Sequence, residues 1–219
     1  MSVTLNQPAP ELQVAQWVQG HPVSFSDLKG KVVLVEVFQV NCPGCFLYAL
    51  PEVIRLHDMF QEQGLVILGL ATAFEDYDKN NLENLQALVG SGTVVGETQK
   101  ALEKTSELVD GNFRWHLPFP VAMDNVIPDD DPITDDKILA YAKRIHPDIE
   151  QRRAEEQDYI LKMVAQYLKQ KTMKAETFEN YDLKGTPSSI LIDREGILRD
   201  VAFGQVDVLE PMIKQYLSD

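Results

Sequence analysis

Both cysteines of this 219-residue chain lie in one short motif, Cys42-Pro-Gly-Cys45, where an apolar strand pattern gives way to a helical one. The preceding segment, VVLVEVF at residues 32–38, is typical of a strand buried on both faces of a sheet. From Cys42 onward the apolar side chains recur at spacings of three and four, which predicts a helix that ends at Gly64. A second buried strand is predicted at residues 65–72. This order predicts a βαβ unit with a parallel pair of strands.

The spacing of the two cysteines favours a working dithiol. Two cysteines separated by two residues at the start of a helix can close a disulfide without moving the backbone. Cys42 stands at or next to the helix N-cap, and Pro43 suits the first helical position. The unsatisfied N–H groups and the dipole of a helix N-terminus favour the thiolate, which is the reactive form of cysteine. We therefore expect Cys42 to attack a substrate disulfide and Cys45 to resolve the mixed disulfide.

Two other interpretations of the cysteine pair stay open at this point. Half of a zinc site would need a second pair of ligands, and the four histidines stand singly along the chain. A pair of inert buried cysteines would fill a core, but Pro-Gly at a strand-to-helix junction is unusual for that purpose. We therefore expect no metal, and no cofactor other than the redox-active cysteine pair.

The remaining pattern predicts a compact α/β chain that is interrupted once. Thr134 is placed to cap a helix that runs to about His146, and Asp148 with Gln151 resembles a capping box for a second helix. Because the segments on both sides complete one sheet, we expect a single domain, 1–219, with a helical insertion at 126–173. The other predicted elements are strands at 12–18, 21–25, 119–124, 188–193 and 197–203, and helices at about 80–89, 99–108 and 206–217.

The order of strand, CPGC, helix and strand, followed by a late Y-x-x-x-G-T-P-x-x-x-L-I-D segment, resembles the thioredoxin superfamily in its TlpA-like or redoxin (AhpC-TSA-type) branch. The segment LNQPAPEL near the start resembles the redoxin leader. The resemblance covers about residues 6–125 and 174–219. It implies a thioredoxin-like fold, in which helices flank a central mixed sheet and the helical insertion precedes a cis-proline loop. The residues of the late match are Tyr181, Gly185, Thr186, Pro187, Leu191, Ile192 and Asp193.

The resemblance also implies a set of site residues beyond the two cysteines. The Thr186–Pro187 bond should be cis, and its loop should bind substrate together with Pro43 and Gly44 of the motif. Relatives carry a buried acid at the position of Glu36, six residues before Cys42. We expect this carboxylate to exchange a proton with Cys45. The other interpretation is that Glu36 points outward from a sheet edge.

This chain departs from its relatives at two places near the motif. Pro51 follows Cys45 by six residues, whereas relatives usually have five, and this predicts a local bulge in the helix. The aromatic residues that usually precede the motif are replaced by Gln39 and Asn41. We therefore expect a more polar approach to Cys42 and a substrate that differs from the usual one.

The motif and the resemblance together predict a thiol–disulfide oxidoreductase, acting as a disulfide reductase. An atypical peroxiredoxin-like peroxidase stays open, although Val35 and Gln39 stand where peroxiredoxins carry the proline and hydroxyl residue of the peroxide pocket. A non-catalytic redox-sensing or partner-binding module also stays open, with the 126–173 insertion as its docking element. Oxidase action would fit an exported protein.

Charge and composition limit the partners. The chain has 34 acidic and 20 basic residues and a net charge of −14, so we expect neither nucleic acid nor a membrane surface as a partner. The N-terminus lacks the basic and apolar regions of a signal peptide, and no segment is apolar enough to span a membrane. We expect a cytoplasmic protein with a protein or small-molecule disulfide substrate and a thiol electron donor. A homodimer through the insertion is a further expectation.

Overall fold

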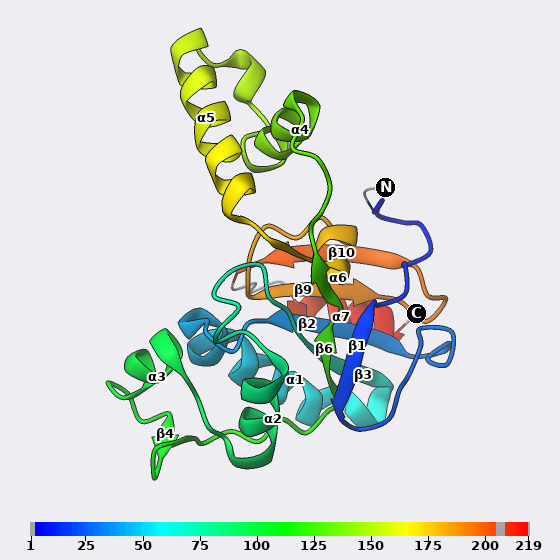
Figure 1. The fold of residues 1–219 in the computed structure, drawn as a ribbon. Helices are drawn as coiled ribbons and strands as arrows, with labels where there is room; N and C mark the ends of the chain where they lie inside the picture. Colours follow the sequence, from blue (N-terminus) through cyan, green and yellow to red (C-terminus); the bar gives the residue numbers. More distant parts are fainter. Residues whose placement is uncertain (1–2, 205–208, 219) are drawn as a thin grey trace. The chain divides into compact units, whose positions relative to one another are not determined.

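The structure is a computed structural model that describes residues 3–204 and 209–218 (Figure 1). Two compact units make up the chain. We call Met1–Val126 with Ala175–Asp219 the sheet unit, and Ile127–Lys174 the helical unit. The boundaries of the helical unit lie one residue from those predicted for the insertion, 126–173.

A six-stranded mixed sheet forms the centre of the sheet unit. Its strands in spatial order are β1 (Val14–Gln19), β6 (Val121–Asp124), β3 (Leu65–Ala71), β2 (Val32–Phe38), β9 (Ser188–Ile192) and β10 (Leu198–Phe203). β2 pairs with β3 in parallel and with β9 in antiparallel orientation. The predicted βαβ unit is therefore present, and β2 lies in the interior of the sheet.

Strand β2 is buried on both faces, as its composition predicts. Side chains alternate between the faces of a sheet, so Leu34, Glu36 and Phe38 share one face. Leu34 and Phe38 pack in the larger apolar cluster of the unit, whereas Val33 and Val35 pack in the cluster on the other face. Glu36 thus lies on the face of the larger cluster.

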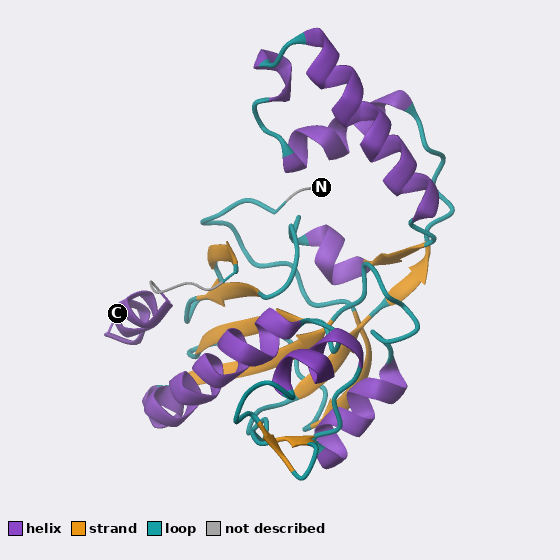
Figure 2. Cartoon of the chain, turned by 90° about the vertical axis from the view of Figure 1, so that its left-hand side faces the viewer, coloured by secondary structure: helices purple, strands orange, loops and turns teal. Residues whose placement is uncertain are grey.

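Helices cover both faces of this sheet (Figure 2). The larger cluster takes buried apolar side chains from α1 (Leu50–Phe60), α2 (Leu82–Ser91), α3 (Gly96–Leu102) and α7 (Leu209–Ser218). The opposite cluster takes Phe178 from α6 (Glu176–Asn180) and Phe25 from the N-terminal segment. This arrangement confirms the predicted α/β class with a mixed sheet flanked by helices. A two-stranded hairpin, β4 (Leu108–Val109) and β5 (Asn112–Phe113), follows α3.

The helix after the motif opens with a π-helical turn, η1 (Cys45–Ala49), before α1 begins. The Leu50 N–H donates to the Cys45 carbonyl, five residues back instead of four. This wider turn accommodates one extra residue and places Pro51 in the first turn of α1, where its missing N–H breaks no helical hydrogen bond. The predicted local bulge is therefore confirmed. A 3-10 turn, η2 (Gln61–Gln63), ends the helix before the left-handed Gly64.

The helical unit consists of α4 (Asp135–Ile145), a 3-10 turn η3 (Ile149–Gln151) and α5 (Ala154–Gln170). Its strands β7 (Val126–Pro128) and β8 (Met173–Ala175) pair with each other. The unit has a small core of its own. The buried members of that core are Ala142, Ile149, Ile160, Val164 and Leu168.

One helix cap in this unit is confirmed and the other is wrong. Thr134 caps α4, and its side chain accepts a hydrogen bond from the Lys137 N–H. Asp148 does not start a long helix, because its carboxylate pairs with Arg152 and only the turn η3 follows it. α5 begins later, with Arg153 as its N-cap.

Two elements predicted for the sheet unit are corrected. Residues 21–25 do not form a strand, because Ser24 begins a turn in which its N–H donates to the Asp27 carboxylate. The helix expected at about 99–108 lies earlier, as α3. It starts at Gly96, whose φ is +59°, and residues 103–107 form turns that lead into the β4–β5 hairpin.

The last helix is described from Leu209 as α7, and residues 206–208 of the predicted helix lie outside the described residues. Among the residues described, no helix combines the length and the apolar composition needed to cross a membrane.

Candidate active site

The two cysteines differ in accessibility. Cys42 lies four residues after Phe38, the last residue of β2, and is partly exposed. Cys45, the first residue of η1, is fully buried. Both thiols are free. The Cys45 N–H donates to the Cys42 Sγ over 3.3 Å, and the Cys42 thiol donates to the Thr186 carbonyl over 3.6 Å. Cys42 is therefore the sulfur that an incoming disulfide can reach.

The surroundings of the two thiols push their pKa values apart. The pKa of Cys42 is lowered to about 6, first because the Cys45 thiol donates to its sulfur. A hydrogen bond from the Thr186 side chain and the backbone N–H groups of Cys45 and Gly44 lower it further. Burial raises the pKa of Cys45 well above its ordinary value, and the neighbouring Cys42 raises it further. At neutral pH one thiolate and one thiol therefore share the site.

The loop before β9 lies against the cysteine motif. Its Thr186–Pro187 peptide bond is cis. Gly44 faces the Pro187 ring, since a Cβ added to Gly44 would lie 3.9 Å from Pro187 Cδ. Gly185 approaches Phe203 so closely that an added Cβ would lie 2.6 Å from the ring. Phe203 is 58% exposed, so an apolar ring borders this loop at the surface. The sequence interpretation did not identify it.

Glu36 is a buried acid in the middle of the sheet. It lies on the interior strand β2 with 1% of its surface exposed, so the interpretation that it points outward from a sheet edge is wrong. Its Oε2 accepts a hydrogen bond from the Ser189 hydroxyl over 2.7 Å, whereas its Oε1 is buried and has no hydrogen-bond partner among the described residues. Burial raises the pKa of Glu36 to about 8, and the negative charge of Cys42 adds to the shift.

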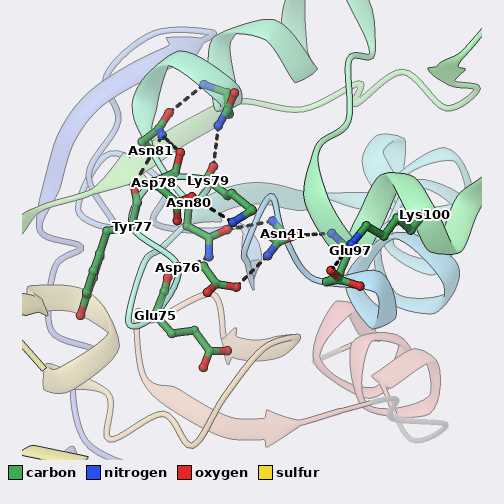
Figure 3. Close-up of polar contacts among 11 residues, drawn as sticks. Asn41, Glu75, Asp76, Tyr77, Asp78, Lys79, Asn80, Asn81, Glu97 and Lys100 are labelled. Atoms are coloured by element: carbon green, nitrogen blue, oxygen red, sulfur yellow. Dashed lines mark hydrogen bonds and ion pairs between the residues drawn. The ribbon is translucent and has the colours of Figure 1, made fainter. Parts of the chain in front are cut away.

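Asn41 ties the segment before Cys42 to two other parts of the sheet unit (Figure 3). Its Oδ1 accepts from the Glu97 N–H over 2.7 Å, and its Nδ2 donates to the Asp76 carboxylate over 2.7 Å. Its backbone N–H donates to the Asn80 side chain over 2.8 Å. The first turn of α3 and the loop at 75–81 are thus both held to the residue that precedes the reactive thiol.

The polar approach to Cys42 that was expected from Gln39 and Asn41 is corrected by these contacts. Gln39 is 2% exposed and Asn41 is 8% exposed. The Gln39 amide oxygen accepts from the Phe74 N–H, so this side chain too holds the loop after β3. Both amides are buried because the backbone groups of the neighbouring loops need partners. They brace the end of β2 and do not face an incoming substrate.

A second buried acid, Asp124, was not identified from the sequence. Its carboxylate accepts hydrogen bonds from the Thr72 hydroxyl and from the N–H groups of Thr177 and Phe178 in the first turn of α6. Burial raises its pKa to about 6. Asp124 therefore fixes α6, the helix that leads toward the loop containing Thr186. The sequence feature that could have identified Asp124 is an acidic residue at the end of an apolar strand.

Comparisons with known proteins agree with this arrangement. A family model described as the AhpC/TSA family matches residues 5–130. The protein FixW of Rhizobium leguminosarum is 34% identical over 74 residues, which are 34% of this chain and 33% of FixW. The chain thus matches about a third of the length of that relative.

Two solved structures cover nearly the whole chain. A thiol-disulfide isomerase from Corynebacterium glutamicum is 29% identical, with a TM-score of 0.61 over 98% of each chain. A thioredoxin-like superfamily protein is 26% identical, with a TM-score of 0.61 over 97% of each chain. The mixed sheet and its flanking helices are therefore the thioredoxin-like fold that the motif predicts.

Proposed function

The chain belongs to the AhpC/TSA family, and on that premise we propose that it is a thiol–disulfide oxidoreductase that reduces protein disulfides with Cys42 and Cys45. The observation that carries the proposal is the asymmetry of the pair. Cys42 is accessible and its pKa is lowered to about 6, while Cys45 is buried and its pKa is raised. A nucleophile and a resolving thiol need these two properties.

The first proposed step is attack by the Cys42 thiolate on one sulfur of a substrate disulfide. A bond forms between Cys42 and that sulfur, and the other substrate sulfur leaves as a thiolate. The loop at Thr186–Pro187 and the motif residues Pro43 and Gly44 would bind the substrate chain. The exposed Phe203 ring beside that loop favours a peptide with apolar side chains over a small polar disulfide.

The second proposed step releases the reduced substrate. Cys45 loses its proton to the Glu36 carboxylate, and the resulting thiolate attacks the Cys42 sulfur. The Cys42–Cys45 disulfide forms and the second substrate thiolate leaves, so two electrons pass to the substrate. Glu36 suits this role because it lies on the sheet face against which η1 packs, and because its pKa of about 8 is close to neutral pH.

We propose that the reaction runs in the reducing direction. The Cys42 pKa of about 6 is one below the value of about 7 for thioredoxin. The thiolate of Cys42 is thus favoured to a degree much nearer to thioredoxin, at about −270 mV, than to the oxidant DsbA, whose cysteine pKa is about 3.5 and whose potential is about −120 mV. We accordingly propose a cytoplasmic reductase that a thiol donor returns to its reduced form.

An equilibrium redox titration of the purified protein against dithiothreitol and glutathione buffers tests the function and its direction. Thiol trapping would read the fraction of Cys42 and Cys45 that is oxidised. A single two-electron transition near about −270 mV, the thioredoxin range, supports a reductase, and a value near about −120 mV would make the protein an oxidant. Failure to form the Cys42–Cys45 disulfide at any potential would overturn the proposed function itself.

We also propose that the helical unit forms the contact of a homodimer. Large apolar side chains are exposed on this unit, including Ile145, Tyr159 and Met163. Together with Tyr141 and Tyr167 they line an apolar cavity of about 290 Å³. Burying such side chains against a second copy would remove apolar surface from water, which favours association.

A further inference from the structure

We propose that Ser189 is a positioning residue that holds one oxygen of the Glu36 carboxylate and leaves the other oxygen to exchange the proton with Cys45. The proposal rests on the proposed function, because it assigns the partner of the proposed proton acceptor. It is carried by the hydrogen bond from the Ser189 hydroxyl to Glu36 Oε2, and by the buried Oε1 that makes no hydrogen bond to the described residues.

The sheet register explains why Ser189 reaches Glu36. β2 and β9 are antiparallel neighbours, and Glu36 lies directly opposite Ser189 in this pair. Leu191, two residues further along β9, packs in the larger apolar cluster, so Ser189 points to the same sheet face as Glu36. Ser189 is 4% exposed, so bulk solvent does not compete with Glu36 for its hydroxyl group. This pairing fixes the carboxylate by geometry.

The neighbouring residue on the strand provides an internal comparison. Ser188 is also buried, with 1% of its surface exposed, but it alternates to the opposite sheet face. Its hydroxyl donates to the Gly185 carbonyl over 2.8 Å, whereas the hydroxyl bonded to Glu36 is that of Ser189. The adjacent residues Ser188 and Ser189 are therefore buried to a similar extent but have different hydrogen-bond partners.

The groups that act on Glu36 are few. Cys42 and Cys45 are the titratable groups that interact with it electrostatically. From β3 the residue in register is Gly69, which carries no side chain, and from β9 it is Ser189, which does not titrate. The Ser189 hydrogen bond is the interaction that opposes the effect of burial on the Glu36 pKa. Removing this donor therefore destabilises the ionised carboxylate.

The consequence for the reaction has a definite sign. Glu36 accepts a proton only when it is ionised, and loss of the Ser189 hydroxyl makes ionisation harder. The pH at which the resolving step reaches half its maximal rate should rise by about one unit in Ser189→Ala, because a hydrogen bond to a charged group is worth about that much. At pH 7, about one unit below the Glu36 pKa of about 8, the resolving step should slow about tenfold.

Stopped-flow reaction of the reduced protein with Ellman's reagent, an aromatic disulfide, separates the two steps. Attack by Cys42 releases one aromatic thiolate and forms a mixed disulfide. Attack by Cys45 then releases the second aromatic thiolate and forms the Cys42–Cys45 disulfide, with the Cys45 proton passing to Glu36. Two electrons thus reduce the reagent to two thiolates. The second phase is first-order, so its rate can be followed against pH for each variant.

The expected result is that Ser189→Ala moves the midpoint of the second phase upward, with the first phase unchanged. Ser188→Ala is the matched control and should leave the midpoint where it is. Ser189→Thr keeps the hydroxyl and should restore the wild-type midpoint, which a purely structural role would not predict. In a Glu36→Gln background, Ser189→Ala should have no further effect on the pH profile. An unchanged midpoint in Ser189→Ala, or an equal shift in Ser188→Ala, would overturn the proposal.

A titration that does not depend on turnover separates this proposal from the proposed function. Carbon-13 NMR of the Glu36 carboxyl group in the reduced protein reads its ionisation directly. A higher midpoint in Ser189→Ala than in wild type supports the positioning role even if the protein reduces no disulfide. A wild-type protein without a second phase would instead contradict the proposed function, and equal NMR midpoints would contradict the role of Ser189.

Discussion

The sheet unit and the helical unit bury their apolar side chains to different extents. The sheet unit has apolar clusters on both faces of its sheet, with most members fully buried, whereas the helical unit has a core of five buried side chains. Five of the ten large apolar side chains that are exposed in the described residues lie in the helical unit. The difference indicates a division of labour. The first unit surrounds its reactive groups with a large buried core, and the second leaves large apolar side chains exposed, on which the proposed dimer depends.

The largest expected effect is a loss of activity in the sheet unit without a loss of stability. Cys42→Ser should lower protein-disulfide reduction by at least about a thousandfold, because it removes the nucleophile. Thermal unfolding should stay close to that of wild type. Cys45→Ser is the companion variant, and it should accumulate a mixed disulfide on Cys42 that mass spectrometry detects. A Cys42→Ser protein with most of its activity would contradict the assignment.

The next largest effect should be a difference between the two cores in the free energy of unfolding that is lost when a buried leucine is removed. Leu34→Ala in the sheet unit should lower the free energy of unfolding by about 3–5 kcal/mol, since Leu34 is fully buried between well-packed layers. Leu168→Ala in the helical unit should cost about 2 kcal/mol, because the smaller core can relax around the cavity. Urea unfolding with hydrogen exchange would report both changes. Loss of exchange protection in β2 after Leu168→Ala would show that the two cores are not independent.

The buried amide next to the reactive thiol should contribute both stability and activity. Asn41→Ala removes two side-chain hydrogen bonds, to Glu97 and Asp76, and leaves buried groups unpaired, so we expect a loss of about 1–3 kcal/mol. Asn81→Ala is the matched control, because it removes the cap of α2 and the hydrogen bond to the Asp78 carbonyl, at a cost of about 1–2 kcal/mol, without removing a contact of Asn41. Only the first variant should slow Cys42 alkylation or disulfide reduction. Equal activity in both would make Asn41 purely structural.

The pH dependence of Cys42 should appear as a tenfold effect. The pKa of Cys42 is lowered to about 6, so the thiolate predominates at pH 7 and disappears as the pH falls below 6. The rate of alkylation by iodoacetamide should therefore fall about tenfold between pH 7 and pH 5. Peptide mapping would assign the modified residue. A midpoint near the ordinary cysteine value would show that the surroundings of Cys42 do not favour its thiolate.

The smallest expected effect on folding concerns the exposed face of the helical unit. Met163→Glu should change the free energy of unfolding by no more than about 0.5 kcal/mol, because Met163 is half exposed. It should nevertheless convert a dimer to a monomer, as measured by sedimentation velocity, and leave disulfide reduction intact. Lys162→Glu is the control, since Lys162 pairs with Asp158 on the surface. A wild-type protein that sediments as a monomer would contradict the dimer.

Local patterns predicted the elements whose causes are local. The apolar run of β2, the Thr134 cap and the π-helical turn before Pro51 all follow from residues close together in the chain. The roles of Gln39 and Asn41 do not, because their partners lie in loops more than thirty residues away. The predicted start of α3 was wrong for the same reason, because the first turn of this helix is held by the distant Asn41 side chain.

The hydrogen-bond partner of Glu36, Ser189, was only partly predictable from the sequence. The acid itself is conspicuous in an apolar strand. Alternation along β9 places Ser189 and Leu191 on one face, but the register that sets Ser189 opposite Glu36 joins strands that are far apart in sequence. Pairing between such strands depends on the whole sheet, so a single sequence indicates which serines face inward but not what each one touches.

The pairing of β7 with β8 brings the two ends of the helical unit together, since the Asp129 N–H donates to the Thr172 carbonyl beside them. A segment with adjacent ends can be lengthened, replaced or excised with little change to the chain on either side. The helical unit is therefore a segment that can be exchanged as a whole. Exchange of this one segment would replace the exposed apolar side chains of the helical unit and leave the sheet that carries Cys42 and Cys45 unchanged.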